Sequence, residues 1–316
     1  MARSRVALVA VLCVLVASSL DCKKNGSATP GRCSVAVSIF PIYDLVRRVA
    51  GPDADVALLL PAGRSEHTFD PTPRDVEQVA KSKLGVMIGL GLDPWMAKMM
   101  KDAAPSARVL TLGEKVPTMP IANDPIADEE AHAVKGAGKA DDDHDEKGAT
   151  DPHVWLDPRN AIAMARAIAD DLALVDAPHA QGYRDRGAAL VASLDALDKE
   201  TEARTKTWKT RGFVTFHGSF TYFAKRYGLT IVAVIEPYPG STPTGVYIQK
   251  VLGVVRDKKV PALFSEPQLD PKPAQIIADE AKIPLGVLDP VGGQPETDSY
   301  EKMIRFDVAA LEKVLR

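Results

Sequence analysis

Cysteine is almost absent from this sequence. The 316 residues contain three cysteines, at positions 13, 22 and 33, and none follows Ser34. A chain segment without cysteine can form neither a disulfide framework nor a zinc–thiolate site. Any metal bound after Ser34 must therefore be held by nitrogen and oxygen atoms.

The sequence also lacks long apolar runs, an excess of positive charge and two common hydrolase motifs. Its formal net charge is −3, with 46% hydrophobic and 26% charged residues. This composition fits a globular protein without the basic surface that nucleic acid attracts. No segment reaches the roughly 20 apolar residues that span a bilayer as a helix. Neither HExxH nor GxSxG occurs, which argues against a hydrolase.

The first residues have the layout of a secretory signal. Two arginines precede an apolar run, Val6–Val16, and a stretch of small residues. We therefore expect residues 1–21 to be a signal peptide and residues 22–33 to be a flexible polar tether. Cys22 at the start of the tether is typical of bacterial lipoproteins. Asp21 departs from their pattern, which has a small residue there, so lipidation of Cys22 is one of two open alternatives.

Strand-like and helix-like segments alternate along the chain, which predicts an α/β fold with parallel sheets. Residues 178–208 carry apolar side chains near helical spacing and predict one long, rigid helix of about 45 Å. We expect it to join an N-terminal lobe, residues 34–177, to a C-terminal lobe, residues 209–316. The expected strands lie at 34–38, 55–60, 84–88, 212–216, 230–235, 262–266 and 286–289, and the expected shorter helices at 42–50, 73–80, from 157 onward, 219–227, 244–256 and 273–281.

Residues 123–150 interrupt this alternation. They include a cluster of acids and almost no apolar residues, so they cannot cover a core and predict a mobile loop. His132 and His144 lie among the acids. Two interpretations remain open: a weak accessory metal site, or a solvated acidic loop with two incidental histidines.

Three other histidines lie in loops or at strand ends. His67 stands in GRSEHTFDPTP, before a helix whose start has an N-cap and a proline; His153 stands in DPHVWLDP; and His217 ends GFVTFH. Ligands of open α/β sheets bind beyond the carboxyl ends of the strands, where Asp289 also falls. Three imidazoles and one carboxylate suit Zn²⁺ better than cations that prefer oxygen shells. The alternative is a set of unrelated loop histidines.

Several carboxylates near these histidines have two interpretations. Glu66, Glu236 and Glu266 would either orient the imidazoles, because ligating histidines usually donate their other N–H to an acceptor, or occupy turns and helix ends. Trp155 and Phe216 are expected to pack beside the site.

In these segments the sequence resembles the zinc- and manganese-specific solute-binding proteins of bacterial ABC importers, the cluster A-I family. The resemblance covers nearly all of the chain after the signal and is carried, in order, by SIFPIYDLV, GRSEHTFDPTPRDV, HVWLDP, FHGSFTYFAKRYGL, SEPQLDPKPAQIIADEA and LDPVGG. It implies two lobes joined by a rigid helix and a metal held in the cleft between them. His67, His153, His217 and Asp289 fall on the family's ligand positions. The implied partners are the membrane permease and the ATPase of an ABC importer.

The resemblance also bears on the choice of metal. Zinc members carry histidine at the third ligand position, as His217 does here, whereas manganese members usually carry glutamate. The loop at 123–150 is poorer in histidine than in many zinc members, so an Mn²⁺ or Fe²⁺ importer subunit and a metal-dependent adhesin stay as alternatives. A zinc hydrolase fits less well, because Asp289 as a fourth ligand would close the open position that catalysis needs. We expect a monomer in the periplasm or on the outer face of the cytoplasmic membrane.

Overall fold

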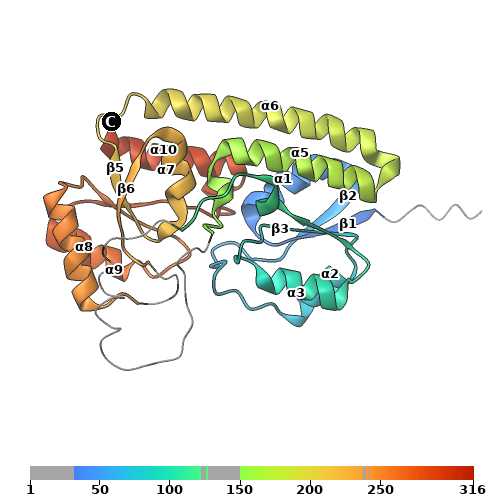
Figure 1. Cartoon of the computed structure of the whole chain (residues 1–316), viewed down its shortest axis with the longest axis horizontal. Helices are drawn as coiled ribbons and strands as arrows, with labels where there is room; N and C mark the ends of the chain where they lie inside the picture. Colours follow the sequence, from blue (N-terminus) through green and yellow to red (C-terminus); the bar gives the residue numbers. More distant parts are fainter. Residues whose placement is uncertain (1–31, 122–125, 127–149, 238–239, 241) are drawn as a thin grey trace, which may run out of the picture. The chain divides into compact units, whose positions relative to one another are not determined.

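The computed structural model describes residues 32–121, 126, 150–237, 240 and 242–316 (Figure 1). The expected signal peptide, Cys22, His132 and His144 lie outside the described residues. Among the described residues, no helix combines the length and the apolar character needed to cross a membrane.

A four-stranded parallel sheet forms the first half of the described chain, with strand order β2-β1-β3-β4. Parallel neighbours need crossover connections, which the helices after β1, β2 and β3 supply. The strands are β1 (Cys33–Val37), β2 (Ala54–Leu58), β3 (Leu84–Met87) and β4 (Arg108–Thr111), and the helices are α1 (Phe40–Ala50), α2 (Pro73–Ala80) and α3 (Pro94–Ala103).

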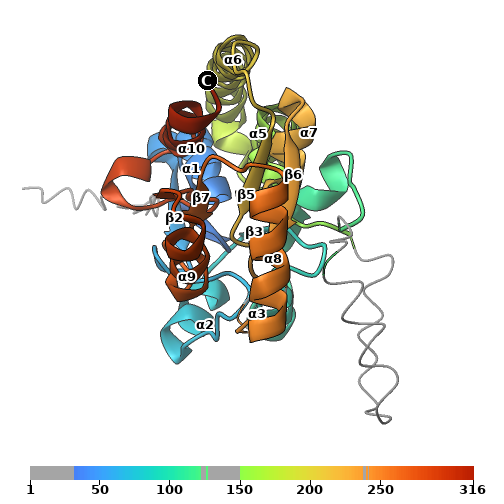
Figure 2. The same cartoon turned by 90° about the vertical axis from the view of Figure 1, so that its left-hand side faces the viewer.

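Two smaller parallel sheets, β5-β6 and β7-β8, form the second half. Their strands again alternate with helices, and this half of the chain faces the viewer in Figure 2. The elements are β5 (Gly212–Thr215), α7 (Thr221–Tyr227), β6 (Thr230–Val234), α8 (Gly245–Asp257), β7 (Leu263–Ser265), α9 (Lys272–Ala281) and β8 (Leu285–Val287).

Three helices lie along one another and link these two halves. The expected long helix is α6 (Ala180–Thr205), which packs along α5 (Pro158–Val175) and contacts α1 (Figure 1). The C-terminal helix α10 (Tyr300–Leu315) contacts both α6 and α1. One apolar core runs without a break from β1 through α5 and α6 to α10.

The α/β class with parallel sheets and a long helix is confirmed. Among the described α-helices and β-strands, three were not expected from the sequence: α3, β4 and α10. The segment of α10 begins with Ser299, whose hydroxyl accepts the N–H of Lys302 and caps the helix, so a sequence signal was present there. The division into lobes at 34–177 and 209–316 stays a prediction.

Local sequence chemistry fixes the helix starts nearest the histidines. At α2, Thr72 and Asp75 form a reciprocal capping box, and Pro73 occupies the first turn. At α5, the carboxylate of Asp157 accepts the N–H of Arg159. These caps hold the ends of the loops that carry His67 and His153.

Candidate metal centre

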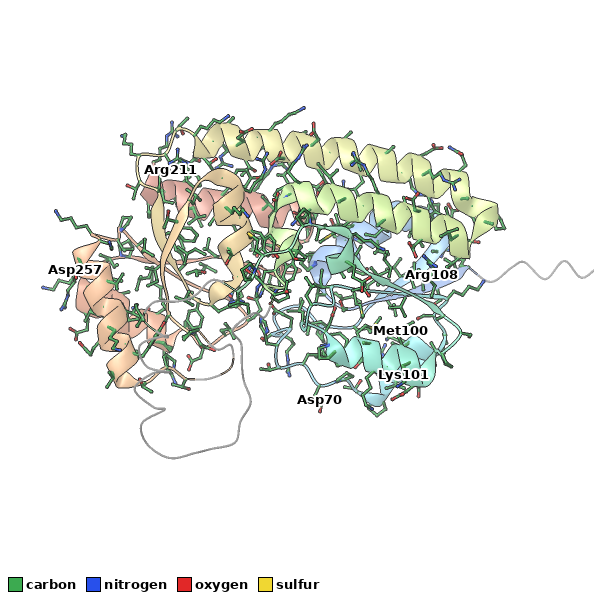
Figure 3. The ribbon with its side chains drawn as sticks, in the orientation of Figure 1. Asp70, Met100, Lys101, Arg108, Arg211 and Asp257 are labelled. Carbon is green, nitrogen blue, oxygen red and sulfur yellow. The ribbon has the colours of Figure 1, made fainter. Side chains whose placement is uncertain are left out.

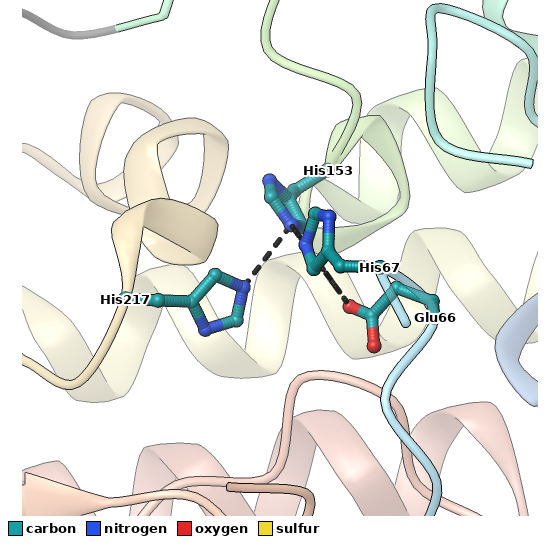
Figure 4. Close-up of side chains that lie close together, drawn as sticks. All are labelled: Glu66, His67, His153 and His217. Atoms are coloured by element: carbon teal, nitrogen blue, oxygen red, sulfur yellow. Dashed lines mark hydrogen bonds and ion pairs between the residues drawn. The ribbon is translucent and has the colours of Figure 1, made fainter. Parts of the chain in front are cut away.

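Four side chains from distant parts of the sequence meet at one point (Figure 4). They are Glu66, His67, His153 and His217, and one potential ligand atom from each lies within 4.8 Å of all the others. His67 and Glu66 lie on the loop between β2 and α2, and His217 lies two residues after the end of β5. His153 precedes a short 3-10 turn, η3 (Val154–Leu156), that leads into α5.

The spacing of the ring nitrogens matches a tetrahedral metal ion. The Nε2 atom of His153 lies 3.3 Å from that of His67 and 3.2 Å from that of His217. Two nitrogens bound to one zinc ion at tetrahedral angles and about 2.0–2.1 Å lie about 3.3 Å apart. The Nε2 atom of His153 therefore already stands at the separation that a shared zinc ion requires from each of the other two imidazoles.

Glu66 completes the group with an oxygen. Its Oε1 atom lies 3.8 Å from His67 Nε2 and 4.0 Å from His153 Nε2. This oxygen is buried, and no described residue forms a hydrogen bond with it. A buried carboxylate oxygen without a partner is costly, and a cation at the centre of the group would supply the missing interaction.

Two of the imidazoles are oriented by carboxylates. The Nδ1 atom of His153 lies 2.8 Å from Asp151 Oδ1, and that of His217 lies 2.6 Å from Glu266 Oε2. An Nδ1–H donated to a carboxylate leaves the Nε2 lone pair free for a metal and makes the imidazole a stronger ligand. The structure thus supports the orienting role for Glu266. Glu236 accepts the N–H of Gly240.

The charge states of the group follow from burial and neighbours. Burial, together with the nearby His153 and His217, lowers the pKa of His67 to about 2, so its imidazole is neutral. Burial acts to lower the pKa of His217 too, but the charge and hydrogen bond of Glu266 outweigh it and raise this pKa to about 9. Burial raises the pKa of Glu66 above its usual range. The metal-free site therefore holds exchangeable protons that a cation would displace.

Asp289 does not belong to this group among the described residues. Its Oδ1 atom accepts hydrogen bonds from Gln268 Nε2 at 2.7 Å and from the N–H of Gly292 at 2.8 Å. Its Oδ2 atom accepts one from the hydroxyl of Thr297 at 2.8 Å. The carboxylate thereby organises the turn after β8. Its role as a metal ligand stays a prediction.

Several residues of the site were missed in the sequence or were given another role there. Asp151 orients His153, and the hydroxyl of Tyr222 in turn donates to the backbone oxygen of Asp151 at 2.9 Å. Glu66 was considered as an orienting group or a turn carboxylate, and not as a ligand. The signals available were adjacency, because Glu66 precedes His67 and Asp151 stands two residues before His153. As expected, Trp155 packs beside the site, with its ring 5.3 Å from that of His153.

Parallel βα units that bring together three histidines and a carboxylate, all but His67 buried, define the class of metal-binding α/β proteins. The family model described as zinc-uptake complex component A, periplasmic (ZnuA), matches residues 35–314. The chain belongs to this family.

Individual relatives show how far the similarity extends. The high-affinity zinc uptake system protein ZnuA of Brucella abortus is 30% identical over 304 residues, which cover 89% of this chain and 91% of the relative. The zinc-binding protein AdcA of Streptococcus pyogenes is 26% identical over 271 residues, 85% of this chain, and this chain spans only about half (52%) of that relative. A crystal structure of ZnuA superposes with a TM-score of 0.77 at 23% identity, covering 90% of this chain and 100% of that one, which shows a shared fold.

Proposed function

We propose that this protein captures Zn²⁺ outside the cytoplasm and delivers it to an ABC importer. The observation that carries the proposal is the position of His153 Nε2, which lies 3.3 Å from His67 Nε2 and 3.2 Å from His217 Nε2 in a group whose ligand atoms all lie within 4.8 Å of one another. Nitrogen-rich four-coordinate sites suit zinc, whereas Ca²⁺ and Mg²⁺ need more oxygen ligands. Membership of a zinc-uptake family agrees with this choice of metal.

His67, His153 and His217 supply three nitrogen ligands in this proposal, and a carboxylate supplies the fourth. Glu66 is favoured by its position, because its unpartnered Oε1 faces the three imidazoles (Figure 4). Asp289 is favoured by the resemblance but would have to give up bonds to Gln268 and Thr297. Four protein ligands leave no open coordination position, which supports a binding protein rather than a hydrolase.

The partners follow from the same proposal. A periplasmic zinc-uptake component hands its metal to a membrane permease driven by an ATPase, and we propose this pair as the partners here. We place the protein as a monomer in the periplasm or on the outer face of the cytoplasmic membrane. A lipid on Cys22 would hold it at that face.

Metal analysis and cellular uptake together test the proposal. Protein freed of metal, dialysed against zinc and washed should retain about one ion per chain, and a His153→Ala/His217→Ala variant should retain almost none. Cells lacking the gene should accumulate less labelled zinc from a zinc-poor medium, and the wild-type gene, but not the double variant, should restore uptake. A double variant that binds or restores uptake like the wild type would refute the proposal.

A further inference from the structure

The residues of the metal centre are not all held equally firmly: His153 and His217 are fixed by their neighbours, whereas His67 is not. The side chains of His153 and His217 are only 6% and 3% exposed, and the Nδ1 atom of each lies within hydrogen-bond distance of a buried carboxylate. The backbone after His153 is bound as well, because the hydroxyl of Tyr300 donates to Trp155 O at 2.6 Å and Trp155 Nε1 donates to Pro290 O at 2.7 Å. His153 and His217 therefore form a fixed pair of ligands.

His67 lacks this support. Its side chain is 22% exposed, and among the described residues no oxygen accepts a hydrogen bond from its Nδ1. It lies on the segment 59–72 between β2 and α2, which also carries Glu66. Of the backbone N–H groups in residues 65–70, only that of His67 donates a hydrogen bond to a described residue, to Ser65 Oγ at 3.3 Å. The loop that supplies His67 and Glu66 is therefore weakly held by its own backbone.

One aromatic contact takes the place of the missing backbone bonds. Two residues beyond His67, Phe69 packs edge-to-face on Trp95 of α3, with ring centroids 4.8 Å apart and planes at 70°. Phe69 rests against the main apolar core. Trp95 rests against a smaller core to which α3 itself contributes Met99 and Met100, the second of which is labelled in Figure 3. Such aromatic pairs favour the seated loop by roughly two- to tenfold beyond the effect of the area they bury, and loss of the buried area of the Phe69 ring adds to this bias.

We propose that Phe69 is a positioning residue that sets how long the metal stays bound, because it seats the loop carrying Glu66 and His67 against Trp95. The metal leaves when this contact breaks and both loop ligands withdraw together, while His153 and His217 stay in place. Capture runs in reverse: the fixed pair meets the ion first, and the loop closes the coordination shell. This inference rests on the proposed zinc-binding function.

Zinc release from the intact protein tests the role of Phe69. Zinc-loaded protein is mixed in a stopped-flow instrument with an excess of a chromophoric chelator. Phe69→Ala should release zinc about tenfold faster than the wild type, since the seated loop is less favoured. Phe69→Tyr keeps the ring and should release zinc within about twofold of the wild-type rate. An unchanged rate in Phe69→Ala would overturn the inference.

Two control variants separate positioning from general damage. Met99→Ala weakens the smaller core without removing the ring contact, so it should lower the melting temperature of the metal-free protein and leave the release rate within about twofold of the wild type. Tyr183→Phe removes a hydrogen bond to Asp176 that lies away from the metal centre, and should also leave the rate unchanged. If either control speeds release as much as Phe69→Ala does, the inference is wrong. A wild-type protein that takes up no zinc would instead refute the proposed function itself.

Discussion

Nδ1 of His217 lies 2.6 Å from Oε2 of Glu266, in a pair whose side chains are 3% and 1% exposed. Because water is excluded, the carboxylate charge acts strongly on the imidazole and favours its protonated form. The same contact fixes the ring so that Nε2 points at His153 Nε2. The pair therefore has two opposite effects on metal binding: it orients a strong ligand, and it holds a proton that the metal must displace.

Replacing Glu266 by Gln should change the pH dependence of zinc affinity. In the wild type, the pKa of His217 is raised to about 9 by Glu266, so apparent affinity should fall by about tenfold per pH unit as pH drops from 9 to 7. Without the carboxylate charge this pKa falls, and the decline should begin at lower pH. Affinity at pH 9 should also drop by about 10–100-fold, because the ring is a weaker ligand.

Competition with a chelator of known pH dependence, between pH 6 and 9, measures both effects. His67 should add little to the slope in this range, because its pKa is lowered to about 2. Parallel pH profiles for the wild type and Glu266→Gln would show that the proton on His217 does not compete with zinc.

A matched pair of substitutions tests which carboxylate is the fourth ligand. We expect Glu66→Gln to weaken zinc binding by more than the roughly 100-fold of an orienting residue, because it removes a charged oxygen at the centre of the group. Asp289→Asn should mainly lower the melting temperature of the metal-free protein, since Asp289 accepts bonds from Gly292 and Thr297.

Equilibrium zinc titration and thermal unfolding of both variants, made side by side, give the answer. The reverse pattern, with zinc binding lost in Asp289→Asn and kept in Glu66→Gln, would establish the ligand set expected from the resemblance. Either outcome identifies the carboxylate that contacts the metal.

Much of the fold was readable from local patterns. The helix at 73–80 was predicted to the residue because a cap, a proline and an acid mark its start. The long helix was predicted as 178–208 and spans Ala180–Thr205, with ends that differ by a few residues, as helix ends usually do. β4 was not predicted: in its four residues, RVLT, only Leu110 is buried, so the apolar signal is weak.

The site was harder to predict, because its members meet only through the tertiary fold. His67, His153 and His217 were chosen for their places at strand ends and in loops, and the structure brings their Nε2 atoms together. Nothing local in the sequence distinguishes Glu66 from Asp289 as an oxygen donor. That difference depends on which carboxylate the fold leaves without hydrogen-bond donors, and Asp289 meets Gly292 and Thr297 within its own turn.

Deleting the acidic loop should leave the main site almost intact. The prediction of a mobile loop at 123–150 falls mostly outside the described residues, but the base of the loop is described: Pro120 and Thr150 form an antiparallel bridge, and the N–H of Asp151 donates to Met119 O at 2.8 Å. A short Gly-Gly link in place of residues 123–148 keeps this base, which holds Asp151 against His153. Zinc affinity should stay within about tenfold of the wild type, no more than the change of an orienting residue. A loss of several hundredfold would mean that the loop supplies a direct ligand.

Zinc should bind more tightly than manganese and should stabilise the fold more. Three imidazoles and one carboxylate suit zinc, and two pairs of the Nε2 atoms have the spacing of a tetrahedral site. Divalent metals also generally follow an affinity order that places zinc well above manganese. An ion that binds only the native state stabilises it by RT ln(1 + [L]/Kd), about 4 kcal/mol at a thousandfold excess over Kd. Melting temperatures measured at pH 7.5 with equal free concentrations of the two metals should therefore rise further with zinc. The His153→Ala/His217→Ala variant is the control, because it retains the fold's other contacts and should respond to neither metal. A larger shift with manganese than with zinc would identify a manganese-binding member of the family and would rule out the assignment of zinc as the transported ion.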